Sequence, residues 1–381
     1  MPIRLACRPT LVLNRACLRL LLVGLLFTTS AGQAATQVDY RIDTLAEGLA
    51  HPWSLAFLPD GSMLITEREG RLRIVRDGEL LSEPVSGMPD VYVRSQAGLF
   101  DVLPDPEFDR NGWIYLAFAQ GTNRSNATRV VRAHFDGAAL HDVETLLTVE
   151  PAKNTPVHYG GRLLFLPDGT LLITTGDGFN YREQSQHLDS LMGKTLRIHP
   201  DGRVPDDNPF VAEPEARPEI WSYGHRNPQG LALDPADNQV YLHEHGPRGG
   251  DELHSLEAGH NYGWPVITYG KDYSGAEVTP FRERPGMTQP LTWWDPAIAP
   301  SGLAVYRGDA FPEWDGKLLV GGLVSRDVRL VRLTDDGAED LGALFEEVGQ
   351  RIRDVRLGPD GAIYLLTDSP QGRLLRVTPG G

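Results

Sequence analysis

The sequence predicts an all-β chain folded as a six-bladed β-propeller with four-stranded antiparallel blades. Three observations support this fold class. A unit made of an alternating apolar run, a Pro-Asp-Gly-type turn and a second apolar run recurs six times. Glycine and proline supply 70 of the 381 residues (41 Gly and 29 Pro), enough for many tight turns but below the share typical of disordered chains. Long stretches of helical periodicity are absent between the repeats.

Each repeat reads as a β-hairpin, because apolar residues alternate on both sides of a turn triplet. The units cover residues 54–67, 99–118, 162–178, 230–246, 302–323 and 354–368, and their turn prolines are Pro59, Pro104, Pro167, Pro235, Pro312 and Pro359. One four-stranded unit cannot bury both of its faces, so neighbouring units must stack, which favours a closed ring over the alternative of a stacked sandwich. We expect residues 38–48 to add a strand to the unit formed by 350–379 and so close the ring.

Residues 1–34 have the composition of a secretory signal peptide. Four arginines and no acidic residue precede a short apolar run, and small and polar residues follow it. We expect cleavage after Ala34, which leaves residues 35–381 as a single propeller domain. Processing would remove both cysteines, Cys7 and Cys17, and the loss of four arginines would change the formal net charge from −15 to −19. The predicted location is therefore periplasmic or secreted.

Charge and composition exclude several classes of function. A strongly negative chain argues against nucleic acid as a partner, because phosphate binding needs a basic face. A processed chain without cysteine cannot be a disulfide-stapled scaffold. Apart from the apolar run of the signal peptide, which is too short to cross a bilayer, no stretch suggests a membrane span.

The hairpin at residues 162–178 is flanked by two residues that can act together as a base. His158 precedes its first strand and Asp177 follows its second, so pairing of the strands would bring both to one end of the blade. A carboxylate beside an imidazole fixes its tautomer and stabilises its protonated form. A general base and an ordinary loop histidine remain equally open from this pattern. Gln96, in the turn before another strand, is a weaker candidate of the same kind.

Two further segments concentrate cations and amides. Arg226 and Asn227 lie together at a strand entrance, a pairing that can hold an anionic or carbonyl-bearing ligand or simply cap a turn. Arg351 and Arg353 share one face of a predicted strand. In so acidic a chain, this cationic face favours a small polyanionic ligand, although a solvated edge strand would look the same.

The segment 243–252 is the densest candidate for metal binding. Its glycines allow close approach of backbone carbonyls, and Asp251 and Glu252 supply hard oxygen ligands, a combination that suits Ca²⁺ better than zinc. His243 and His245 allow a zinc interpretation, but their spacing is not that of a helical zinc motif.

Six segments resemble, in order, the soluble quinoprotein sugar dehydrogenases of the glucose/sorbosone dehydrogenase family, over residues 38–379. They are HYGGRLLFLPDGTLLITTGDG, SYGHRNPQGLALDP, HEHGPRGGDE, NYGWPVITYG, IAPSGLAVY and RIRDVRLGPDG. The resemblance implies a six-bladed propeller that oxidises the C1 hydroxyl of aldose sugars to lactones by hydride transfer to pyrroloquinoline quinone (PQQ), with Ca²⁺ bound to the cofactor. It also implies an electron acceptor, which the sequence does not identify, and a monomer or homodimer.

The resemblance also implies roles for individual residues. His158 would be the general base, oriented by Asp177, with Arg226 at the same catalytic centre. The carbonyls of Gly246 and Pro247 would hold the Ca²⁺ on PQQ, whereas Glu252 and the backbone of Tyr262 resemble a separate structural Ca²⁺ site. The residues expected to line the cofactor site are Gln96, Arg226, Asn227, Tyr273, Arg351 and Arg353.

Two positions depart from the family pattern. The usual GQGG turn is replaced by Ser95-Gln96-Ala97-Gly98, and the lysine that some members place against the cofactor in the fifth blade is missing. Arg326 is a candidate replacement for this lysine. The alternative functions are a non-catalytic propeller that binds a carbohydrate or protein, and a metal-dependent lactonase.

Overall fold

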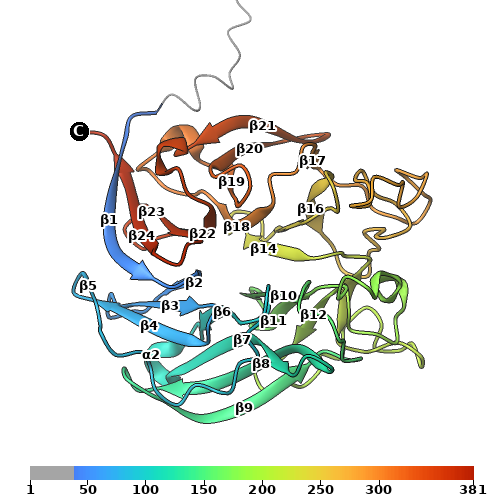
Figure 1. Cartoon of the computed structure of the whole chain (residues 1–381), viewed down its shortest axis with the longest axis horizontal. Helices are drawn as coiled ribbons and strands as arrows, with labels where there is room; N and C mark the ends of the chain where they lie inside the picture. The colour runs from blue at the N-terminus through green and yellow to red at the C-terminus, as the bar shows by residue number, and fades with distance from the viewer. Residues whose placement is uncertain (1–37) are drawn as a thin grey trace, which may run out of the picture.

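The computed structural model describes residues 38–381 and forms a ring of six four-stranded antiparallel sheets (Figure 1). The predicted propeller is therefore confirmed, and the sandwich alternative is wrong. The expected signal peptide and its cleavage point lie outside the described residues. None of the helices within 38–381 is long and apolar enough to span a membrane.

The blades follow one another along the chain, with the innermost strand of each blade named first here. The first two blades are β2 (Pro52–Phe57), β3 (Met63–Glu67), β4 (Arg71–Arg76) and β5 (Glu79–Leu80), then β6 (Leu99–Pro104), β7 (Trp113–Gly121), β8 (Asn126–Phe135) and β9 (Leu140–Thr148). The next two are β10 (Gly160–Phe165), β11 (Leu171–Thr175), β12 (Lys194–Ile198) and β13 (Ile220–Tyr223), then β14 (Pro228–Leu233), β15 (Val240–Glu244), β16 (Asp251–Leu256) and β17 (Thr292–Trp294). The last two are β18 (Pro300–Val305), β19 (Leu318–Gly322), β20 (Val328–Thr334) and β21 (Gly337–Leu344), then β22 (Ile352–Leu357), β23 (Ile363–Thr367), β24 (Gly372–Pro379) and β1 (Tyr40–Leu49).

The ring is closed by its two chain ends. Strand β1 pairs antiparallel with β24, from Tyr40 opposite Pro379 to Leu49 opposite Gly372. Figure 1 shows the blue N-terminal strand lying along the red C-terminal blade. The expectation that residues 38–48 complete the last blade is thus confirmed. Within the described part of the chain, helical structure is confined to four short segments: α2 (Phe108–Asn111), η1 (Arg182–Gln186), η2 (Pro312–Trp314) and η3 (Glu346–Val348).

The hydrophobic core is divided among the interfaces between blades. Six buried clusters each combine residues of neighbouring blades, as Leu172 of the third blade and Leu242 of the fourth illustrate. This arrangement explains the repeat pattern, because each sheet buries both faces against its neighbours.

The axis of the ring is filled by a charged network rather than by apolar side chains. Arg162 of β10 lies 3.0 Å from Asp354 of β22, and Arg356 lies 3.0 Å from Asp101 of β6 and 2.9 Å from Asp354. Two arginines and two aspartates balance one another in charge, which makes their burial tolerable. This buried charged network occupies the centre of the ring. The candidate site lies in cavities lined by the chain segments that precede or follow the strands around the axis.

Candidate active site

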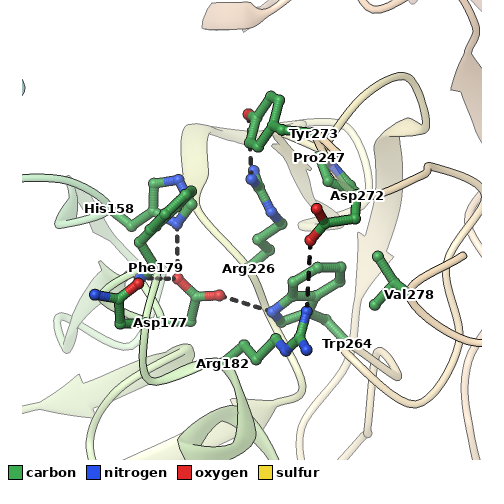
Figure 2. Close-up of a pocket in the computed structure, with 11 residues that line it drawn as sticks. His158, Asp177, Phe179, Arg182, Arg226, Pro247, Trp264, Asp272, Tyr273 and Val278 are labelled. Carbon is green, nitrogen blue, oxygen red and sulfur yellow. Dashed lines mark hydrogen bonds and ion pairs between the residues drawn. The ribbon is translucent and has the colours of Figure 1, made fainter. Parts of the chain in front are cut away.

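Most of the predicted catalytic and cofactor-binding residues line two neighbouring cavities, whereas Gly246 and Glu252 line a small third one. The first, which we call the histidine lobe, has a volume of about 290 Å³ and is lined by His158, Asp177, Arg226 and Tyr273 among others (Figure 2). The second, the arginine lobe, has a volume of about 190 Å³ and is lined by the predicted cofactor residues Gln96, Asn227, Arg351 and Arg353. Gln96 links the two, because its Oε1 accepts a hydrogen bond of 2.8 Å from the backbone N–H of His158.

The structure brings His158 and Asp177 together at the end of the hairpin formed by β10 and β11. The imidazole Nδ1 lies 2.7 Å from Asp177 Oδ1, and His158 is only 4% exposed. His158 has a positive φ of 54°. A non-glycine residue in this conformation is uncommon and often marks a functional position.

Asp177 is held by more partners than the sequence suggested. Its second oxygen, Oδ2, accepts a hydrogen bond of 2.7 Å from Trp264 Nε1, and Oδ1 also accepts one of 2.7 Å from the backbone N–H of Phe179. Burial would raise the pKa of Asp177, but His158, Arg226 and the Phe179 N–H together lower it. The carboxylate is therefore ionised and acts as an acceptor, so Nδ1 of His158 carries the hydrogen and Nε2 keeps its lone pair.

Burial and the nearby Arg226 both influence the protonation state of His158. Its guanidinium donates to the carbonyl of His245 at 3.0 Å and to the hydroxyl of Tyr273 at 3.3 Å, as Figure 2 shows for the tyrosine. Burial and Arg226 lower the pKa of His158, and the opposing effect of Asp177 does not offset them. His158 is thus neutral at neutral pH, with a free Nε2, which is the state that a general base requires.

An aromatic rim borders the histidine lobe and was not predicted from the sequence. Phe179 is 43% exposed, has a positive φ of 68° and lies edge-on to His158 with 5.2 Å between ring centroids. Its ring stacks loosely on Tyr273, which is 59% exposed, at 6.2 Å. Arg182 and Asp272 form a long ion pair of 3.9 Å on the same rim.

The arginine lobe contains an acidic residue that the sequence analysis also missed. Asp368 Oδ2 lies 2.9 Å from Arg353 Nη2 and 3.4 Å from Arg351 Nε, while Oδ1 lies 2.8 Å from His51 Nδ1. Burial would raise the pKa of Asp368, but Arg353, His51 and Arg351 hold it well below its usual range. Tyr273, predicted for the cofactor site, lies instead in the histidine lobe with Arg226.

Two backbone carbonyls at the predicted metal position are free to bind a cation. Gly246 donates its N–H to Asp251 at 2.9 Å, and Pro247 lines the histidine lobe. Neither residue's carbonyl accepts a hydrogen bond from any residue in the described chain. A Cβ at position 246 would lie 2.2 Å from the carbonyl oxygen of Gly250, so only glycine fits this turn.

Glu252 lies in a buried cluster of mixed charge. Its carboxylate is 3.3 Å from His254 Nε2, which is also 3.5 Å from Glu244. Burial would lower the pKa of His254, but Glu244 and Glu252 raise it to about 9. The ring of Tyr262 packs at 4.8 Å from that of His254.

His243 and His245 do not form the zinc pair that the sequence allowed. Their Nε2 atoms contact two different carbonyls, those of Gly302 at 3.3 Å and Pro300 at 2.7 Å. Burial lowers the pKa of both imidazoles to about 3, so both are neutral.

The comparisons with known proteins agree with this geometry. A model of the glucose/sorbosone dehydrogenase family matches residues 49–376. The aldose sugar dehydrogenase YliI of Escherichia coli strain K12 is 43% identical over 364 residues, which cover 94% of this chain and 98% of that protein. The crystal structure of the soluble E. coli aldose sugar dehydrogenase in its apo-form, also 43% identical, superposes with a TM-score of 0.86 and covers 90% of this chain and 100% of that one.

A more distant structure shows the same fold with its cofactor. The PQQ-bound form of the aldose sugar dehydrogenase of Streptomyces coelicolor is 28% identical, with a TM-score of 0.72 over 90% of this chain and 99% of that one. On the evidence of the family match and the E. coli relative, this chain belongs to the glucose/sorbosone dehydrogenase family of sugar oxidoreductases.

Proposed function

We propose that this protein is an exported PQQ-dependent aldose sugar dehydrogenase that oxidises the C1 hydroxyl of an aldose to the lactone. One observation carries the proposal: a neutral, oriented histidine with a free Nε2 faces a cavity that adjoins a lobe lined by arginines. The PQQ-bound relative and the sugar specificity in the names of the relatives support this assignment. Export is proposed from the composition of residues 1–34.

The side chains that line the arginine lobe suit a flat polyanion such as PQQ. PQQ is a flat aromatic system with three carboxylates, and the lobe combines the aromatic side chains of Trp53, Phe100 and Tyr159 with two guanidiniums. Arginine is suited to carboxylates because its planar fork can donate two hydrogen bonds. The amides of Gln96 and Asn227 can complete the polar contacts.

One of the two predicted calcium positions fits a cation well. The free carbonyls of Gly246 and Pro247 are hard oxygen ligands; Pro247 lines the histidine lobe, and Gly246 lines a small separate cavity that shares Arg226 and Trp264 with it. We propose that they hold the Ca²⁺ of the cofactor. The position at Glu252 also offers ligands, because Glu244, Glu252 and His254 each direct one ligand atom to within 4.8 Å of the others.

The residues of the histidine lobe explain how the sugar loses its proton. His158 Nε2 accepts the proton of the C1 hydroxyl, and Asp177 stabilises the resulting imidazolium through Nδ1–H. Arg226 lies close enough to lower the pKa of His158, and its charge also stabilises negative charge that develops on the sugar oxygen. Bound PQQ would supply the two-electron acceptor for the hydride of the C1–H bond.

The aromatic rim offers a surface for the sugar ring. Phe179 and Tyr273 present exposed rings beside His158, and the apolar face of a pyranose can pack on such rings. The polar groups of Asn180, Arg182 and Asp272 line the same lobe and can bind hydroxyl groups remote from C1.

The proposal is tested with the purified protein, PQQ and Ca²⁺. We expect an aldose to reduce an artificial electron-accepting dye only when PQQ has been added. A matched control substrate is 1,5-anhydroglucitol, which has the pyranose ring of glucose but no C1 hydroxyl and should give no turnover.

Two results would contradict the proposal. One is an absorbance titration that shows no binding of PQQ to the wild-type protein. The other is dye reduction that proceeds equally well with 1,5-anhydroglucitol. The first would favour a non-catalytic binding propeller, because the scaffold alone does not fix the function.

A further inference from the structure

The arginine lobe carries less positive charge than its two predicted arginines suggest. Arg351 and Arg353 share the carboxylate of Asp368, which these two arginines and His51 keep ionised although burial would raise its pKa. Two guanidiniums and one carboxylate leave a formal charge of +1 for a cofactor that bears three carboxylates. The proposed Ca²⁺ would sit at Gly246 and Pro247, which do not line this lobe. If the proposed function holds, a carboxylate of PQQ that lies in the arginine lobe would therefore be paired best by a further cation there, because an unpaired buried carboxylate is costly.

Arg68 lies at the same lobe and has no partner of its own. It follows β3 directly, is partly buried, and lines the cavity together with Gln96 and Arg353. Within residues 38–381, its guanidinium makes no hydrogen bond or ion pair with any side chain or carbonyl. A partly buried guanidinium with five free donors can pair with an anion without first breaking a contact in the protein.

The backbone of Arg68 is fixed between two blades. Its N–H donates to the carbonyl of His51 at 3.1 Å, and its own carbonyl accepts from the N–H of Leu99 at 3.0 Å. His51 is also the residue that contacts Asp368, so Arg68 and the arginine–aspartate group are linked through one residue. The point from which the Arg68 side chain enters the lobe is therefore set by these backbone contacts.

Gly98 leaves room for the stem of Arg68. A Cβ on Gly98 would lie 2.5 Å from Arg68 Cγ and 2.2 Å from Arg68 O, distances that no side chain could tolerate. Gly98 ends the turn that carries Gln96, the segment in which this chain departs from the GQGG pattern. This turn thus places the Gln96 amide and admits the Arg68 side chain beside it.

Arg326, the replacement considered for the missing fifth-blade lysine, lies elsewhere. It is exposed and lines neither lobe. In that blade, the arginine lobe is bordered instead by Leu323, whose carbonyl accepts a hydrogen bond of 3.2 Å from Arg351 Nη1. The fifth blade of this chain therefore contributes no cation to the lobe.

We propose that Arg68 is a cofactor-binding residue that pairs with a carboxylate of PQQ, in a lobe to which the fifth blade contributes no cation. The inference rests on the proposed function. It concerns the affinity for the cofactor, and it assigns no part of the proton transfer to Arg68.

The test is a titration of the apoprotein with PQQ in the presence of Ca²⁺, in which isothermal titration calorimetry measures the Kd. We expect the Kd to rise about 10- to 100-fold in Arg68→Gln, because a charge-assisted pair is lost. Arg68→Lys should lie between this variant and the wild type, since it keeps the charge but not the fork. Arg326→Gln is the matched control, which removes an exposed arginine and should bind PQQ as the wild type does.

A second readout separates a charge contact from a structural role. The Kd of the wild type should rise with salt concentration more steeply than that of Arg68→Gln, because one ion pair fewer is screened. Equal Kd values for the wild type and Arg68→Gln would overturn the assignment of Arg68. A rise in Kd for Arg326→Gln as large as that for Arg68→Gln would also overturn it. Failure of the wild type itself to bind PQQ would instead overturn the proposed function, so the two failures are distinguishable.

Discussion

Two buried histidine–carboxylate pairs lie close together in the propeller, and their distances are nearly equal. His158 and Asp177 are 2.7 Å apart, and His225 and Glu244 are 2.9 Å apart. Burial is the largest effect that lowers the pKa of both histidines. The pairs differ in the environment of the second ring nitrogen. His225 Nε2 lies 2.8 Å from the hydroxyl of Ser222, whereas His158 Nε2 has no partner among residues 38–381.

The two carboxylates also differ in the groups that they hold. Asp177 accepts a hydrogen bond from Trp264, and both residues line the histidine lobe. Glu244 also accepts the backbone N–H groups of Arg226 and Asn227, so it holds the segment that carries two predicted site residues. One pair presents a reactive nitrogen to a cavity, and the other stabilises the frame behind it. A histidine beside an acid is therefore informative only when the second nitrogen is known to be free.

The largest expected effect is that of His158→Ala. Loss of the base should lower kcat by about 10²- to 10⁴-fold, the usual contribution of a general base. Dye-coupled turnover measures the fall, and added imidazole should restore part of the rate because the cavity left by the side chain opens onto the histidine lobe. A variant that retains more than a tenth of the wild-type kcat would contradict the role of His158.

The next effect is that of Asp177→Asn. Both oxygens of Asp177 accept hydrogen bonds, so an amide can serve only one of its two side-chain partners, and kcat should fall by about 10- to 10³-fold. Asp177 raises the pKa of His158, and His158 must be deprotonated to act as a base. Loss of the carboxylate should therefore move the acidic limb of the kcat/KM profile to lower pH.

Arg226→Gln should shift the pH profile in the direction opposite to that of Asp177→Asn. Arg226 lowers the pKa of His158, so its removal should move the acidic limb to higher pH. Shifts in the same direction for both variants would show that the profile does not report the titration of His158.

The sequence predicted the fold because the relevant signals are local. Alternation around a turn identifies each hairpin without knowledge of its neighbours, and six copies then imply a ring. His158 and Asp177 could be paired for the same reason, since they flank one hairpin. Asp368 follows β23 just as Asp177 follows β11, and Arg351 precedes β22. Asp368 could thus have been found by the same argument.

Other parts of the site depend on contacts that no local pattern encodes. Trp264 lies 87 positions from Asp177, and their hydrogen bond depends on how the long segment between β16 and β17 folds back over the neighbouring blade. The exposed ring of Phe179 depends on a positive φ that sequence preferences argue against. The contact between Glu252 and His254, by contrast, is encoded locally, because residues two apart on a strand point to the same face.

Trp264→Phe should have a smaller effect than the changes at the dyad. Phenylalanine keeps most of the packing but leaves Asp177 Oδ2 without its indole donor at 2.7 Å. Loss of one hydrogen bond to a charged group corresponds to about 1.5 kcal/mol, or roughly a tenfold fall in kcat. The KM for the sugar should change little, because Trp264 acts through Asp177. A large rise in KM with an unchanged kcat would instead place the indole in direct contact with the substrate.

His225→Ala should have the smallest effect on turnover, with kcat within about threefold of the wild type, even though it removes a pair as short as the catalytic one. Its effect should be on stability, because Glu244 loses a buried donor and the Ser222 hydroxyl loses one of its two side-chain contacts, keeping the one with Thr195. We expect the free energy of unfolding of the apoprotein to fall by about 1–3 kcal/mol in urea. His225→Asn, which can keep a donor toward Glu244, should recover part of this loss. If His225→Ala instead lowered kcat as strongly as His158→Ala while the protein stayed folded, the free Nε2 would not be what distinguishes the two pairs.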